Sequence, residues 1–249
     1  MYLCGGGMAS QIATIMDCKN FFYRIYVVLI ALPIFVVFTI ITALIAAFGA
    51  ILGAERTFGY WPGVIWSRVT LALLLIPVSV KGKEHLPKDR ATVVTPNHTS
   101  ALDIFLLYGY SGVRFKWVMK GAIRKIPFVG WSCEKLGFIF VDNTPSGGTK
   151  VVDACEYAID TGYHIFIFPE GTRSGDGKLS RLKKGAFKIA KETHAPIVPA
   201  KIRGGYEILR RGSWLINWGK LSLEFFAPIE TNQGQTIEDL MEEVRTLIG

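Results

Sequence analysis

Apolar residues divide the chain into one long uninterrupted run and a later region of short alternating segments. Between Ile25 and Ala54 no charged residue occurs, and these thirty residues exceed the roughly 20 that a membrane-spanning helix needs. A second apolar stretch, Val69–Val80, is too short to span a bilayer but suits an interfacial or re-entrant helix. We therefore expect membrane-anchoring helices at 25–80, preceded by a flexible N-terminus at 1–24.

Two other roles for the long apolar run fit its pattern less well. A secretory signal peptide has a shorter apolar core and a small-residue cleavage site before a polar mature region. A buried hairpin of a soluble protein seldom contains thirty consecutive uncharged residues. The run is interpreted as a membrane anchor, and its pattern leaves open whether it spans the bilayer or lies within one leaflet.

From Lys81 onward, short β-rich runs alternate with segments of helical periodicity. Several of the runs are almost wholly apolar, which is typical of strands covered on both faces of a sheet. The pattern predicts an α/β domain at 81–249, with a layered, mostly parallel or mixed sheet flanked by helices. The expected strands are 91–95, 115–119, 138–141, 164–168, 196–202 and 221–226, and the expected helices include 149–160, 183–193 and 237–248.

The distribution of charged residues along the chain favours a membrane surface, and not nucleic acid, as the partner of this domain. Residues 1–80 contain only six charged side chains, whereas the remainder carries 24 Lys and Arg against 18 Asp and Glu. Cations follow the apolar run more often than they precede it, which favours an inner or cytoplasmic membrane with the globular domain on the cytoplasmic side. No nucleic-acid-binding motif accompanies the charge. The four dispersed cysteines indicate a reducing compartment.

Two basic segments, Arg114–Lys125 and Arg210–Trp218, mix cations with apolar side chains. Either could bind anionic lipid headgroups, where each Lys or Arg contributes about 1 kcal/mol. Either could equally be an ordinary basic surface, and the sequence leaves both interpretations open.

The stretch TPNHTSALD at residues 95–103 contains one of only four histidines. A helix is expected to begin at Ser100, which leaves His98 in the preceding loop and Asp103 in the first helical turn. A carboxylate there can bind one imidazole nitrogen and leave the other free to accept a proton. Ser100-x-x-Asp103 also matches a capping box, which needs no chemistry. From these residues alone, a catalytic pair and a capped helix start both remain open.

A second polar loop, FPEGTRS at residues 168–174, directly follows an apolar strand pattern. Gly171 permits close approach of a ligand or unusual backbone angles. The planar guanidinium of Arg173 suits a phosphate, and Thr172 adds a hydroxyl. The alternative is a surface turn on which Arg173 pairs with Glu170.

The two loops together make the chain resemble the glycerolipid acyltransferases, specifically the 1-acyl-sn-glycerol-3-phosphate acyltransferases. The N-H-x-S-x-x-D block of that family is matched by Asn97–Asp103, and its F-P-E-G-T-R-S block by Phe168–Ser174. Gly137–Asn143 corresponds to the family's G-x-x-F-I-D-R block, and Val198–Ala200 to its later V-P-x block. The four blocks occur in the family's order over about 100 residues.

One position departs from the family pattern. Asn143 stands where the family usually has an arginine that helps to hold the glycerol phosphate. Asn143 can donate a hydrogen bond but carries no charge, so another cation must compensate or charge must matter less for the acceptor. Lys120 is the best candidate for that cation.

The resemblance implies acyl transfer from acyl-CoA or acyl-carrier-protein to the 2-hydroxyl of lysophosphatidic acid, which gives phosphatidic acid in phospholipid biosynthesis. His98 would take the hydroxyl proton and Asp103 would orient His98, with no acyl-enzyme, metal or further cofactor. The alternatives are another acceptor, namely glycerol 3-phosphate or a different lysolipid, and a membrane-anchored hydrolase that uses the same pair on water. The expected substrate-binding residues are Lys120, Asn143, Glu170, Gly171, Thr172 and Arg173.

Overall fold

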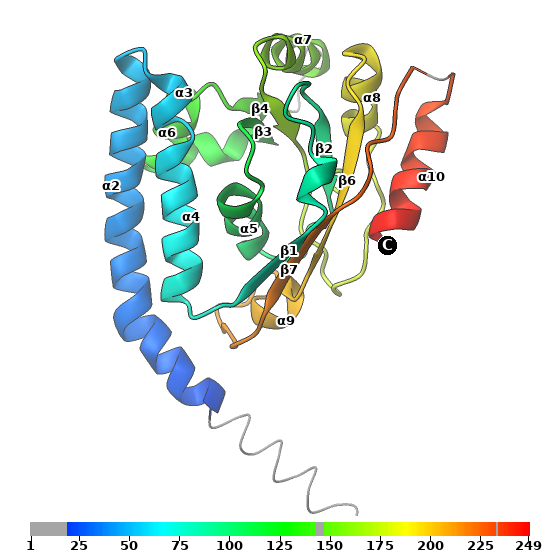
Figure 1. Cartoon of the computed structure of the whole chain (residues 1–249). Coiled ribbons are helices and arrows are strands. Elements are labelled where there is room, and N and C mark those ends of the chain that lie inside the picture. The colour runs from blue at the N-terminus through cyan, green and yellow to red at the C-terminus, as the bar shows by residue number, and fades with distance from the viewer. Residues whose placement is uncertain (1–18, 143–146, 233) are drawn as a thin grey trace, which may run out of the picture.

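Seven strands form one mixed sheet at the centre of the molecule. The computed structural model describes residues 19–142, 147–232 and 234–249 (Figure 1). The strand order is β1-β7-β6-β2-β5-β3-β4, and every neighbouring pair is parallel except β6 and β7. This arrangement confirms the predicted α/β class. The strands are β1 (Val78–Lys81), β2 (Val93–Pro96), β3 (Phe115–Lys120), β4 (Ile139–Val141), β5 (His164–Phe166), β6 (Ile197–Arg203) and β7 (Leu221–Phe225).

Helices cover both faces of this sheet. The main helices are α2 (Leu32–Ile51), α4 (Trp61–Leu73), α5 (Leu102–Tyr110), α7 (Gly147–Asp160), α8 (Gly185–Glu192) and α10 (Ile237–Ile248). Shorter ones are α3 (Glu55–Phe58), α6 (Val129–Lys135), α9 (Gly205–Ile208), and the 3₁₀ turns η2 (Lys83–His85) and η3 (Gly121–Lys125). Figure 1 shows α4 and α5 on one side of the sheet and α7, α8 and α10 on the other.

The sheet separates two apolar cores, because successive side chains of a strand point to opposite faces. On β2, Val93 packs into the core under α7, α8 and α10, whereas Val94 packs into the core under α4 and α5. On β5, Ile165 and Phe166 divide in the same way. The central strands are therefore covered on both faces, as their apolar runs predicted.

Six strands lie within a few residues of their predicted positions, but β1 was not predicted. The stretch Val69–Val80 is not one helix: α4 ends at Leu73, Leu75 has a positive φ of 53°, and an edge strand begins at Val78. Pro77 precedes that strand, and proline keeps the residue before it out of the helical region. The apolar stretch is thus divided between a helix end and a strand.

A continuous helix of 33 residues, Lys19–Ile51, is the one helix in the described part of the chain that is long and apolar enough to cross a membrane. It includes a π-helical segment, η1 (Val27–Ala31), which joins directly to α2. Residues 19–24, which we assigned to the flexible N-terminus, are helical, and residues 1–18 lie outside the described part. Figure 1 shows α2 beside α4, and it shows that the long helix bends below them, before α2 begins.

The bend has an identifiable cause and brings residues 19–26 against the end of α4. A π-helical turn followed by proline interrupts regular α-helical hydrogen bonding, and Pro33 is the second residue of α2, two positions after η1 ends. The hydroxyl of Tyr23 donates to the carbonyl oxygen of Leu74 at 2.7 Å, and that of Tyr26 donates to Leu73 at 2.8 Å. These bonds fix the start of the helix to the end of α4.

Candidate active site

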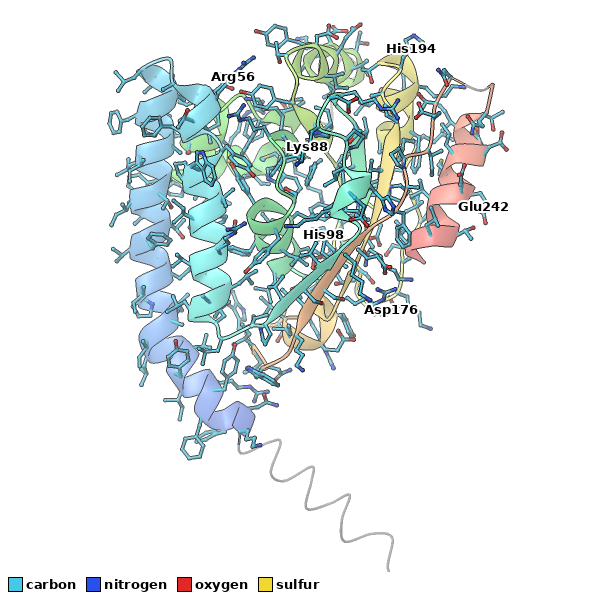
Figure 2. The ribbon with its side chains drawn as sticks, in the orientation of Figure 1. Arg56, Lys88, His98, Asp176, His194 and Glu242 are labelled. Atoms are coloured by element: carbon cyan, nitrogen blue, oxygen red, sulfur yellow. The ribbon has the colours of Figure 1, made fainter. Side chains whose placement is uncertain are left out.

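The two motif loops meet because β2 and β5 are adjacent and parallel. The carboxyl ends of parallel neighbours lie at the same edge of a sheet, where α/β proteins commonly bind their ligands. His98, labelled in Figure 2, lies in the loop after β2, and FPEGTRS follows β5. The backbone N–H of Ser174 donates to the carbonyl oxygen of His98 at 2.8 Å, which joins the two loops directly.

His98 and Asp103 form the pair that the sequence predicted. The Nδ1 atom of His98 lies 2.9 Å from Oδ2 of Asp103, whose side chain is fully buried, while the His98 side chain is 12% exposed. A carboxylate only accepts hydrogen bonds, so Nδ1 carries the proton and Nε2 is left free to take one. The pair therefore has the arrangement of a general base and its orienting carboxylate.

Asp103 also organises the helix start, but not through a complete capping box. Its Oδ2 accepts the backbone N–H groups of Thr99 at 2.7 Å and Ser100 at 2.8 Å. The Ser100 hydroxyl donates instead to the carbonyl oxygen of Leu209 at 2.9 Å, and α5 begins at Leu102. One carboxylate oxygen thus holds both the loop backbone and the imidazole.

An aromatic stack, which the sequence analysis did not identify, fixes the plane of the imidazole. The Phe168 ring lies parallel to the His98 ring, with centroids 3.7 Å apart and planes 12° apart. The Trp117 ring of β3 also stacks on Phe168, with centroids 5.5 Å apart. In the sequence, Phe168 is visible as the aromatic residue that opens the FPEGTRS block. The pattern alone did not indicate that its ring stacks on His98.

The Glu170 carboxylate joins three parts of the site. It is buried, and its Oε1 accepts the backbone N–H of His98 at 2.7 Å, while Oε2 accepts that of Ser180 at 2.7 Å. Both oxygens are already occupied by backbone groups. No ion pair between Glu170 and Arg173 occurs within the described ranges, so the surface-pair alternative is wrong.

Arg173 is half-buried, and its guanidinium forms no ion pair with a carboxylate of the described residues. Its backbone carbonyl accepts hydrogen bonds from Arg211 at 3.1 Å and from the Thr172 hydroxyl at 3.3 Å. A positive side chain without an acidic partner is suited to bind an anion.

A second cation lies over Gly171. This glycine has a φ of +69°, and a Cβ atom there would lie 2.9 Å from Nζ of Lys183. The glycine therefore permits both the left-handed backbone and the close approach of the lysine. The next residue, Lys184, points elsewhere and pairs with Glu238 on the surface.

Of the two remaining predicted residues, only Lys120 can be placed. It is exposed at the carboxyl end of β3, the same edge of the sheet as His98. Asn143 lies outside the described residues. The structure therefore brings Lys183 and Arg211 to the FPEGTRS loop, and it places Lys120 at the same edge.

Two tight contacts close the site from the β6 side. The side chain of Asn97 accepts the backbone N–H of Ile202 at 2.6 Å and donates to the carbonyl oxygen of Ile202 at 3.0 Å. A Cβ atom on Gly205 would lie 2.7 Å from Oδ1 of Asp103 and 2.9 Å from Oγ1 of Thr99. Only a glycine lets the chain after β6 pack this closely on the Asp103 carboxylate. Neither Ile202 nor Gly205 was identified from the sequence.

A cleft at the opposite edge of the sheet does not belong to this site. It lies at the amino end of β3 and is lined by Arg56, Arg114, Lys116 and Tyr163 among others. Lys116 is buried there and pairs with Glu55. No residue of either motif loop lines this cleft.

Comparison with known proteins agrees with the fold and the two loops. The sequence profile of the Acyltransferase family matches residues 77–203, about half of the chain. That range contains His98, Asp103 and the FPEGTRS loop, and the chain therefore belongs to the acyltransferase family. The resemblance inferred from the sequence is confirmed.

Individual relatives make the comparison more specific. The chain is 32% identical over 198 residues to the chloroplastic 1-acyl-sn-glycerol-3-phosphate acyltransferase LPAT1 of Arabidopsis thaliana, a match that covers 78% of this chain and 54% of that protein. It is 27% identical over 167 residues to human 1-acyl-sn-glycerol-3-phosphate acyltransferase alpha, covering 66% of this chain and 59% of the human protein. The chain spans about half the length of the first curated relatives it matches.

A solved structure shares nearly the whole fold. The crystal structure of the 1-acyl-sn-glycerophosphate acyltransferase PlsC from Thermotoga maritima aligns with a TM-score of 0.79 at 26% identity. The alignment covers 94% of both chains. The N-terminal helices and the sheet domain therefore occur together in that protein as well.

Proposed function

We propose that this protein transfers a fatty acyl group from a thioester donor to the 2-hydroxyl of lysophosphatidic acid, which gives phosphatidic acid. The observation that carries the proposal is the His98–Asp103 pair, with a free Nε2, joined to a loop that presents Arg173, which has no carboxylate partner among the described residues. The names of the Arabidopsis, human and Thermotoga relatives support the choice of acceptor.

In this mechanism, Nε2 of His98 accepts the proton of the acceptor hydroxyl as its oxygen attacks the thioester carbon. Asp103 stabilises the imidazolium that forms, and the stack on Phe168 holds the ring in plane. The new C–O bond forms, the C–S bond breaks, and the imidazolium returns its proton to the departing thiolate. The proton balance therefore closes on His98 alone.

Direct transfer to the hydroxyl is supported by the state of the described cysteines. Burial raises the pKa of the Cys133 thiol and of the Cys155 thiol to about 12. The thiolate is the nucleophilic form of cysteine, so neither thiol is activated to form an acyl-enzyme.

The phosphate of the acceptor is assigned to Arg173. Lys183 and Arg211, which contact the same loop, add further positive charge to it. Thr172 and Gly171 complete the loop backbone, while Lys120 and Asn143 are further proposed contacts. We propose that no metal takes part; no group of three His, Cys, Asp or Glu side chains in the described part of the chain is arranged to hold one.

The setting we propose is an inner or cytoplasmic membrane, with the catalytic domain on its cytoplasmic side. The apolar helix Lys19–Ile51 and the excess of cations after it support this assignment. Acyl-CoA and acyl-carrier-protein both remain candidate donors, and no nucleic-acid partner is proposed.

An acceptor panel tests the function. The full chain is reconstituted in vesicles and supplied with acyl-CoA or acyl-carrier-protein, together with lysophosphatidic acid, glycerol 3-phosphate or lysophosphatidylcholine. We expect phosphatidic acid from lysophosphatidic acid. Free fatty acid released at one rate with and without acceptor would identify a hydrolase, and acylation of another acceptor alone would overturn the proposed substrate.

A further inference from the structure

The segment between α9 and β7 exposes large apolar side chains that catalysis does not explain. We call residues 209–218 the tryptophan loop. Trp214 is 97% exposed, Leu215 is 60% exposed and Trp218 is 51% exposed. Arg210 and Arg211 precede them in the same loop. Adjacent exposed tryptophan and leucine side chains usually mark an interaction surface.

The tryptophan loop is fastened to the start of the N-terminal helix. The guanidinium of Arg24 donates to Oδ1 of Asn217 at 2.7 Å and to the carbonyl oxygen of Ile216 at 3.4 Å. The backbone N–H of Trp218 donates to Oδ1 of Asn20 at 3.2 Å. The Trp218 indole N–H donates to Leu75, just after α4, at 2.9 Å. The loop is therefore fixed on the anchor, and Figure 1 shows both at the same end of the molecule.

The exposed apolar surface continues from the loop onto the anchor. Beside Asn20 and Arg24, Phe21 is 58% exposed and Phe22 is 69% exposed, and Leu75 is 55% exposed. Tryptophan is enriched where a protein meets the headgroup region of a bilayer, and nearby arginines attract anionic lipids. Apolar continuity with the anchor and the flanking positive charge both favour a lipid surface as the occupant.

The same loop touches both catalytic motifs. The carbonyl oxygen of Leu209 accepts the hydroxyl of Ser100, two residues after His98. The guanidinium of Arg211 donates to the carbonyl oxygen of Arg173. Trp214 thus lies three residues from a direct contact with the loop assigned to the acceptor phosphate.

We propose that the tryptophan loop is a second membrane-binding element, in which Trp214 enters the headgroup region of an anionic bilayer and holds the Arg173 loop at the lipid surface. The link between this loop and the active site rests on the proposed function, whereas the contact of the loop with the membrane does not. The bilayer would then meet the protein at the anchor and beside the active site, so that an acceptor lipid need not leave the membrane.

Fluorescence quenching tests the membrane contact without any activity. Full-length wild-type protein and the Trp214→Phe variant are reconstituted in vesicles of phosphatidylcholine and phosphatidylglycerol, with or without bromine on the acyl chains. We expect bromine to quench part of the tryptophan fluorescence of wild type, and we expect this part to be missing in Trp214→Phe. The matched control is Tyr157→Trp on α7, where the native side chain is 73% exposed, and its added signal should not be quenched. Equal quenching of wild type and Trp214→Phe would overturn the proposal and favour a protein partner for the loop.

Kinetics test the link to the active site. We expect Trp214→Ala to raise the KM for lysophosphatidic acid in anionic vesicles by roughly tenfold, as for loss of an interfacial anchor, with kcat nearly unchanged. The KM for a short-chain lysophosphatidic acid dissolved as monomers should stay the same. An equal rise for both forms would overturn the membrane role. A wild-type protein inactive on both forms would refute the proposed function and leave the quenching result standing.

Discussion

The histidine loop and the FPEGTRS loop lie at one edge of the sheet but are built in opposite ways. Oδ2 of Asp103 binds the imidazole and two backbone N–H groups inside a fully buried setting. Arg173, in contrast, is half-buried and has no carboxylate partner among the described residues. In the proposed mechanism, the first loop is pre-organised for proton transfer, whereas the second keeps its charge available for a ligand.

Removing the base should have the largest effect. We expect His98→Ala to lower the rate of acyl transfer by roughly 10²–10⁴-fold, because the proposed mechanism assigns the proton of the acceptor hydroxyl to His98. The rate of phosphatidic acid formation from lysophosphatidic acid in vesicles measures this loss. Thermal unfolding and recovery in the membrane fraction should match wild type. Acyl transfer by His98→Ala at the wild-type rate would refute the mechanism.

Removing the charge of Asp103 should come next. In Asp103→Asn, the amide can donate a hydrogen bond to Nδ1 and so favour the wrong tautomer of His98, and we expect a fall in kcat of roughly 10²–10⁴-fold. Replacing the carboxylate that holds two backbone N–H groups should also lower the free energy of unfolding by about 1–3 kcal/mol. Rates are measured well below the unfolding midpoint, so that the two effects separate. An unchanged kcat would show that Asp103 serves only the helix start.

Removing the anion-binding charge should weaken binding more than chemistry. We expect Arg173→Ala to raise the KM for lysophosphatidic acid by roughly 10–100-fold, since a charged hydrogen bond contributes about 1.5–3 kcal/mol. The matched control is Lys184→Ala, which removes a cation that pairs with Glu238 on the surface and should leave KM unchanged. Equal effects of the two substitutions would mean that general surface charge, and not the Arg173 loop, binds the acceptor.

The sequence predicted the parts of this comparison that depend on local pattern. Strand positions followed from apolar runs, and His98, Asp103 and Arg173 followed from short blocks of polar residues after strands. The roles of Glu170 and Phe168 did not follow. Glu170 binds backbone N–H groups, which every residue except proline carries, and Phe168 stacks on a ring that is distant in sequence. Such contacts exist only after the fold has brought the segments together.

The unpredicted elements have the same origin. β1 contains only four residues and acquires its register from β7, which lies more than a hundred residues later in the chain. The bond between Arg24 and Asn217 joins residues separated by 193 positions. Pairing across such distances is decided by tertiary packing, which local periodicity does not encode.

The smallest expected effect concerns a second enclosed histidine, His164, which can be compared with His98. His164 of β5 is 5% exposed, like His98 in being largely enclosed, but its Nδ1 contacts the Thr92 hydroxyl at 2.8 Å instead of a carboxylate. Burial lowers the pKa of His164 from 6.5 to about 4. Between pH 6.5 and about pH 4, the His164 imidazole is therefore protonated in the unfolded chain but neutral in the folded protein. Its contribution to stability is fully present above pH 6.5 and is lost as the pH falls to about 4.

The expected size of this loss is about 3 kcal/mol, from a pKa difference of roughly two to three units at 1.36 kcal/mol each. The His164→Gln variant keeps a polar side chain without a titrating proton. As the pH is lowered from 6.5 to 4, the thermal unfolding midpoint of His164→Gln in detergent should fall by several degrees less than that of wild type. This difference does not depend on the midpoint of the variant at pH 7. Parallel pH curves would show that His164 is not held neutral by burial. Transfer activity at pH 7 should be unaffected, because the proposed mechanism uses the imidazole of His98, which has a carboxylate beside it.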